Sequence, residues 1–163
     1  MKTLSGKEAV KNINVRKAIA MAIDKTFITE EILNNGSIPA DYFIPKNFVY
    51  KDGEDFRKDN PDGYIHFNVE KAQEEWKMAK EELDFDKVEI EIMNFDSEGS
   101  RKIIEYVQGQ LEKNLPGMSI SINKQPFKNK LKLAQDGNFE IDFAVWGPDY
   151  VDPTTFLEIF RTN

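Results

Sequence analysis

The stretch F-E-I-D-F-A-V-W-G-P-D-Y-V-D-P-T-T-F-L-E-I-F, residues 139–160, decides how this chain folds. Its first eight residues follow a period of two, which is typical of a strand. Pro148 must end that strand, because proline has no N–H for a ladder and its φ is fixed. We therefore predict a strand near 139–146 with these residues on one face: Phe139, Ile141, Phe143 and Val145.

The residues after this strand predict a loop and then a helix. Asp149-Tyr150 falls in the loop at the carboxyl end of the strand, where ligands bind in open α/β sheets. Asp152-Pro153 is typical of an N-cap followed by proline at the first helical position. The loop of this strand–loop–helix unit thus contains an aromatic residue, a flexible backbone position and two carboxylates: Trp146, Gly147, Asp149 and Asp152.

The sequence from Lys87 to this stretch predicts a β-α-β-α-β order. Apolar residues alternate over 87–93 and again over 118–124, which indicates two more strands. Helical periods over 98–114 and 127–135 indicate the connecting helices. Parallel strands joined by right-handed helical crossovers are the natural arrangement. The predicted fold class is therefore α/β, with a small, mainly parallel sheet preceded by a helical segment.

The preceding part of the chain predicts that helical segment. Helices are expected near 14–23, 25–34 and 68–82, with Asn14, Asp24 and Asn68 as N-caps. Trp76 lies in the middle of the apolar stripe of the third helix and is predicted to be a core residue. Residues 1–12 are interpreted as a polar lead-in. Residues 37–63 look irregular, yet they contain enough aromatic side chains to predict that they pack over the domain.

Composition narrows the classes of function. The net charge of −7 and the lack of a basic stripe argue against nucleic acid as a partner. The absence of cysteine excludes disulfides, thiol catalysis and thiolate metal sites. No apolar run approaches the ~20 residues of a membrane-spanning helix. A chain of 163 residues is one domain by its length.

The acidic loop beside a tryptophan suggests a binding site. Such a turn at the carboxyl end of a sheet can bind a cation that has an apolar neighbour, and the ammonium of a peptide's N-terminus fits that description. A metal-dependent hydrolase that uses Asp142, Asp149 and Asp152 is a rival interpretation, but no histidine ligand or activated nucleophile accompanies them. A scaffold domain, with Trp146 buried and Asp149 solvated, is a third.

Two motifs carry a resemblance to a known family. W-G-P-D-Y-x-D-P-T-T-F-L at 146–157 and N-V-R-K-A-I-A-M-A-I-D-K at 14–25 resemble motifs of extracellular oligopeptide-binding proteins. These are the solute-binding subunits of ABC peptide importers, solute-binding protein family 5. The resemblance covers nearly the whole chain, but the chain covers only part of the family's length. It implies a periplasmic-binding-protein-like lobe, residues 1–163, excised from a longer two-lobe protein. It also matches Arg16 to a family arginine, interpreted here as a structural ion-pair partner.

The same resemblance implies the roles of individual residues and the partners. Asp149 would pair with the ligand's α-amino group, Trp146 would lie beside the ligand, and Gly147 would contact its backbone. The implied function is capture of extracellular oligopeptides, without catalysis and without a cofactor. The implied partners are an oligopeptide, the membrane permease and the missing lobe of the same polypeptide. The implied location is the extracellular face of the membrane, with a lipid anchor in the full-length protein, or the periplasm. A non-peptide solute, such as a metal complex or a sugar, stays open as the alternative ligand.

Overall fold

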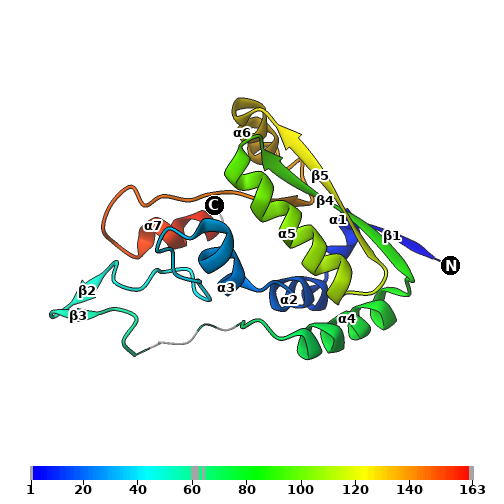
Figure 1. The fold of residues 1–163 in the computed structure, drawn as a ribbon, viewed down its shortest axis with the longest axis horizontal. Helices are drawn as coiled ribbons and strands as arrows, with labels where there is room; N and C mark the ends of the chain where they lie inside the picture. Colours follow the sequence, from blue (N-terminus) through cyan, green and yellow to red (C-terminus); the bar gives the residue numbers. More distant parts are fainter. Residues whose placement is uncertain (1, 60–62, 64, 162–163) are drawn as a thin grey trace.

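A parallel sheet forms the centre of the molecule (Figure 1), in a computed structural model that describes residues 2–59, 63 and 65–161. Its central strand is β4 (Lys87–Phe95), which pairs with β5 (Met118–Gln125) along its length, from Val88 beside Met118 to Phe95 beside Gln125. On its other side β4 pairs first with β1 (Thr3–Ser5) and then with β6 (Ile141–Asp142). All of these pairings are parallel, which confirms the predicted α/β arrangement.

Strand β1 and the short helix α1 (Gly6–Ala9) occupy the region interpreted as a lead-in, so that interpretation is wrong. A three-residue strand is too short to display a period of two, and its pairing with β4 depends on residues more than 80 positions away. Met1, the first residue of that region, lies outside the described residues. Arg16, predicted to be an ion-pair partner, instead bonds to the backbone just after α1: its Nη1 donates to the carbonyl oxygens of Val10 and Lys11 at 3.0 and 2.6 Å.

Strand β6 is much shorter than the predicted strand at 139–146. At its start, the Glu140 carboxylate accepts the Glu91 N–H at 2.7 Å, where a neighbouring strand would otherwise supply a carbonyl. At its end, the Phe143 N–H still donates to the Met93 carbonyl at 2.9 Å. Beyond that point β4 ends at Phe95, so the chain from residue 144 onward leaves the sheet without a ladder partner.

Helices cover both faces of the sheet. Helix α5 (Glu98–Asn114) packs on the face that carries Ile90 and Ile92 (Figure 1), and α6 (Phe127–Gln135) contacts the opposite face, where the Phe127 and Phe95 rings lie 6.5 Å apart. Both helices have the predicted bounds. Helix α5 also closes the outer edge of β5: the Glu112 carboxylate accepts the Ile120 N–H and the Gln108 amide donates to the Ile120 carbonyl, at 2.9 and 2.7 Å.

The helical segment packs beside the sheet. Helices α2 (Ile13–Met21) and α4 (Val69–Leu83) bury the predicted stripes, and Trp76 is 2% exposed, which confirms it as a core residue. The cap of α2 is Asn12, not the predicted Asn14: its side chain accepts the N–H groups of residues 14 and 15 at 2.8 and 3.2 Å. Asp24 caps α3 (Lys25–Phe27), which widens into the π-helix η1 (Ile28–Leu33). Among the described residues no helix combines the length and apolarity needed to cross a membrane.

The segment 37–63 contains an unpredicted hairpin, formed by β2 (Tyr50–Lys51) and β3 (Glu54–Asp55). Its turn is Asp52-Gly53, with φ of 55° and 82°, the left-handed conformation that two-residue hairpins require. The packing prediction for this segment is confirmed, because its aromatic rings contact the C-terminal helices: Phe48 with Phe156 and Phe43 with Phe160, at 5.3 and 4.5 Å. Residues 60–62 lie outside the described residues.

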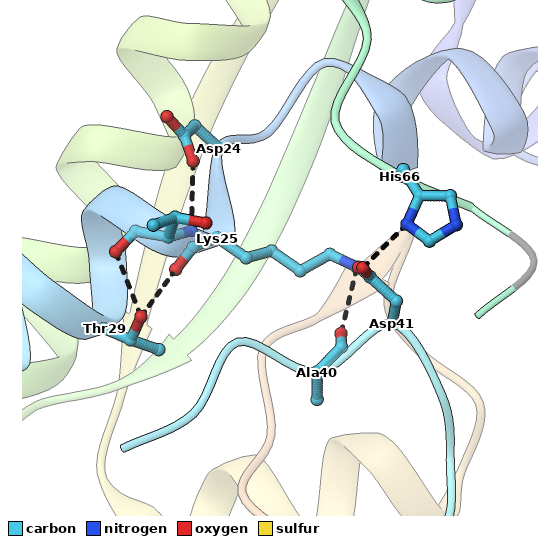
Figure 2. A network of polar contacts seen from close by, with 7 residues as sticks. Asp24, Lys25, Thr29, Ala40, Asp41 and His66 are labelled. Carbon is cyan, nitrogen blue, oxygen red and sulfur yellow. Dashed lines mark hydrogen bonds and ion pairs between the residues drawn. The ribbon is translucent and has the colours of Figure 1, made fainter. Parts of the chain in front are cut away.

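A polar network fastens this segment to α3 (Figure 2). The Lys25 ammonium donates to the Asp41 carboxylate at 2.5 Å and to the Ala40 carbonyl at 3.0 Å. His66 Nδ1 lies 2.9 Å from the other Asp41 oxygen. The hydrogen bond from Lys25, followed by that from His66, holds the pKa of Asp41 below its usual value against the opposing effect of partial burial. The single histidine of the chain therefore lies in a structural ion-pair network.

Candidate ligand-binding site

The candidate site is a stretch of exposed chain between β6 and α7 (Thr154–Leu157), which continues as the 3-10 helix η2 (Glu158–Phe160). Residues 144–152 are all exposed, and we call them the exposed loop. Figure 1 shows this orange stretch leaving the end of the sheet and turning back into α7, which lies near α3. Because β6 is parallel to β4, the loop begins at the carboxyl ends of the strands, as predicted.

Trp146 projects from the first half of the exposed loop and is 51% exposed. Its indole N–H donates to the carbonyl of Thr155 at 3.1 Å, so the ring has a fixed attachment while its surface stays open. The contrast with Trp76, whose indole N–H is bonded to the Pro116 carbonyl inside the core, is clear. The scaffold-domain interpretation, which required a buried Trp146, is therefore wrong.

Asp149 is held by its backbone and leaves its carboxylate free. Its N–H donates to the Thr155 hydroxyl at 3.2 Å. Within residues 2–59, 63 and 65–161, its carboxylate makes no hydrogen bond or ion pair with another group. An exposed carboxylate without a partner, three residues after an exposed indole on the same loop, is suited to a cation with an apolar neighbour.

Asp152, the second carboxylate of the loop, is hydrogen-bonded within the chain through its Oδ1. It accepts the Thr154 N–H at 2.9 Å and the Thr154 hydroxyl at 2.5 Å, and these hydrogen bonds hold its pKa below the usual value. The residue directly before α7 is Pro153, not the predicted Asp152, although Pro153 already has helical dihedrals, φ −56° and ψ −29°. Asp152, one residue earlier, still supplies the capping hydrogen bond, because its carboxylate accepts the first N–H of α7. The two loop carboxylates therefore differ: that of Asp152 has a structural role, and that of Asp149 is free to bind a ligand.

Gly147 lies between Trp146 and Asp149 in the sequence. A Cβ added to it would meet no atom within 4 Å, and its φ is not in the left-handed region. Internal packing therefore does not require glycine at this position. A glycine there keeps the loop backbone accessible to a bound molecule.

The rival metal site does not assemble. Asp142 forms an ion pair with Lys130 of α6, and Asp152 caps α7, so the three aspartates of that hypothesis are directed to different partners. Among the described residues, no group of three or more potential ligands is arranged to hold a metal ion.

A cavity of about 600 Å³ opens at the base of the exposed loop. Aliphatic side chains of α2, η1, β4 and α5 line one part of it, and residues 141–144 form the wall from which the loop departs. Lys25 and Asp142 are the charged residues in the lining. The acidic loop thus adjoins an apolar hollow.

Sequence reasoning named Trp146, Gly147 and Asp149, and the structure places all three on the exposed loop. It missed Thr155, which contacts the first and the last of them. The sequence T-T-F at 154–156 predicts the start of a helix, but no local pattern tells which of the two adjacent threonines is buried.

The sequence of this chain matches a known protein family. The model of bacterial extracellular solute-binding proteins, family 5 Middle, matches residues 1–163. A dipeptide-binding protein of Lactococcus lactis is 31% identical and the dipeptide-binding protein DppE of Bacillus subtilis is 30% identical, each over 96% of this chain. The chain spans only 28% of the length of each of these relatives.

Solved structures agree with the sequence comparison. The substrate-binding domain of an oligopeptide ABC transporter from Bacillus anthracis is 44% identical, with a TM-score of 0.89 over 94% of this chain and 30% of that chain. Listeria monocytogenes OppA bound to peptide is 38% identical, also with a TM-score of 0.89, over 95% of this chain and 31% of that chain. The fold is thus that of a periplasmic binding protein, as expected.

Proposed function

This chain belongs to family 5 of the bacterial extracellular solute-binding proteins, and from that premise we propose that it is one lobe of a protein that captures oligopeptides for import by an ABC transporter. Members of the family bind solutes outside the cytoplasm, and the relatives named above bind dipeptides or oligopeptides. The proposed role of the chain is therefore binding, not catalysis.

The observation that carries this proposal is the free Asp149 carboxylate on the same exposed loop as the half-exposed Trp146, with both residues hydrogen-bonded to Thr155. A peptide's terminal ammonium would donate to that carboxylate, a charge-assisted hydrogen bond worth about 1.5–3 kcal/mol net. The indole would cover the adjacent part of the peptide, and the accessible backbone at Gly147 would let the peptide backbone come close.

The domain assignment is part of the same proposal. Residues 1–163 form one lobe, and the remaining polypeptide supplies a second lobe that closes over the peptide by hinge motion. The membrane permease is the proposed protein partner. The proposed location is the extracellular face of the membrane, with a lipid anchor on the full-length protein, or the periplasm.

Calorimetric titration of the full-length protein tests the proposal. Defined peptides of three to five residues should bind with a dissociation constant of about 1 μM or lower, which corresponds to roughly −8 kcal/mol. An oligosaccharide and a metal chelate serve as the matched alternative solutes. Saturable binding of either of these, with no heat from any peptide, would overturn the peptide assignment.

A further inference from the structure

We propose that Thr155 is the positioning residue of the exposed loop, a single buried residue whose hydroxyl sets the place of Asp149 and whose backbone carbonyl sets the place of Trp146. The inference rests on the proposed function, because it gives the predicted ligand residues their geometry. Thr155 itself would not touch the peptide.

The contacts of Thr155 converge on the loop from a buried position. The residue is 3% exposed. Its hydroxyl accepts the Asp149 N–H at 3.2 Å, and its carbonyl accepts the Trp146 indole N–H at 3.1 Å. Its own N–H donates to the Asp152 carbonyl at 3.2 Å, which fixes it in the first turn of α7.

The first part of the loop has little else to hold it. The last sheet contact before it is the hydrogen bond from Phe143 to Met93. In the part of the chain that the structure describes, residues 144–149 make no hydrogen bond other than the two to Thr155. The positions of the indole and of the free carboxylate therefore depend on one residue.

Thr155 is itself firmly placed. The next residue, Phe156, is also buried and packs edge-on against Phe48 at 5.3 Å, which anchors α7 to the segment before α4. A β-branched side chain has a stiff χ1, so the hydroxyl direction is defined once the methyl group is packed. Its neighbour Thr154 is exposed, and among the described residues its hydroxyl bonds to Tyr150 and Asp152 and to neither Trp146 nor Asp149, so it offers a matched control.

The test compares peptides with a free and an acetylated N-terminus on variants of the full-length protein. Thr155→Val keeps the volume but removes the acceptor of the Asp149 N–H, so the dissociation constant of the free peptide should rise about tenfold. The acetylated peptide, which has no ammonium to place, should bind almost as before. Thr155→Ser should restore most of the preference, and Thr154→Val should leave it unchanged. Equal losses for both peptides would mean a merely structural role and would overturn the proposal.

A second measurement needs neither a ligand nor a variant. In the wild-type protein the Asp149 amide should exchange its hydrogen at least about tenfold more slowly than the Gly147 amide, which has no acceptor among the described residues. Equal exchange rates would overturn the positioning role even if peptide binding is confirmed. Protection of the Asp149 amide in a protein that ignores N-acetylation would support the positioning role and contradict only the ammonium assignment.

Discussion

Replacing Lys130 with methionine should destabilise this protein by about 3 kcal/mol at neutral pH. Lys130 is the buried residue of α6, and its side chain is 5% exposed. It forms an ion pair with Asp142 of β6, whose side chain is 16% exposed. Two large apolar residues of the same helix are exposed, Phe127 at 64% and Leu131 at 46%. A buried charge pair is thus one of the contacts that attach the helix to the sheet, together with the ring contact between Phe127 and Phe95.

The magnitude follows from the burial of both partners. Removing one member of a fully buried pair costs about 3–5 kcal/mol, because the other charge is left without a partner, and the slight exposure of Asp142 places the cost at the lower end. Asp142→Leu should cost a similar amount. The double variant Lys130→Met with Asp142→Leu should lie within about 1 kcal/mol of the wild type, since no charge is then left unpaired.

Urea unfolding of the 163-residue chain, followed by circular dichroism, measures these differences. Lys128→Met is the matched control: Lys128 belongs to the same helix but is exposed, so its loss should change stability by no more than about 0.5 kcal/mol. The reasoning is refuted if Lys130→Met behaves like Lys128→Met, or if the two single losses simply add in the double variant.

Three further predictions concern packing, pH and the isolated chain. Gly6→Ala should destabilise the protein by about 1–3 kcal/mol, because the new Cβ would lie 2.1 Å from the Glu140 carboxylate and 2.7 Å from the Glu89 carbonyl. Gly109→Ala, whose new Cβ would meet no atom within 4 Å, should instead be stabilising, and the urea midpoints of the two variants test this difference. The lowered pKa of Asp41 means that its pair with Lys25 contributes stability above the usual carboxyl pKa of about 4 and loses it as the pH falls through the lower folded value. Lys25→Met should therefore cost about 1 kcal/mol at pH 7 and much less at pH 2; an equal cost at both would contradict this assignment. The 163-residue chain alone should bind peptide at about millimolar affinity or more weakly, since it supplies one side of the cleft, and micromolar binding in a calorimeter would contradict the one-lobe proposal.

The elements predicted well are those with a long local pattern. Helix α5 has its predicted bounds, and its start is fixed by the Ser97 hydroxyl, which accepts the Ser100 N–H at 3.2 Å. Trp76 is also placed correctly in the core, because it lies within an apolar helical stripe, whereas for Trp146 the residues alone leave a core role open and only the family resemblance favours a position beside the ligand. Period and capping chemistry carry enough information for such decisions.

The misses depend on contacts between distant residues. Strand β1 exists because β4 offers an edge, and β6 starts late because the Glu140 carboxylate takes the Glu91 N–H, so neither bound is a property of a local sequence pattern. Lys130 is buried because Asp142 lies opposite, although a lysine in a helix is normally exposed. The hairpin at Asp52-Gly53 is different: Asp-Gly is a recognised type I′ signal, and it was available in the sequence.

The measurement that tests the central claim most directly is a double-mutant cycle at Asp149 in the full-length protein. Dissociation constants are measured for one peptide with a free and with an acetylated N-terminus, on the wild type and on Asp149→Ala. If Asp149 pairs with the ammonium inside a closed cleft, Asp149→Ala should cost about 2–5 kcal/mol with the free peptide. Acetylation should then cost much less on the variant than on the wild type. Asp152→Ala, which removes only a helix cap, should show no such coupling. Additive effects at Asp149, or equal coupling at Asp152, would contradict the assignment.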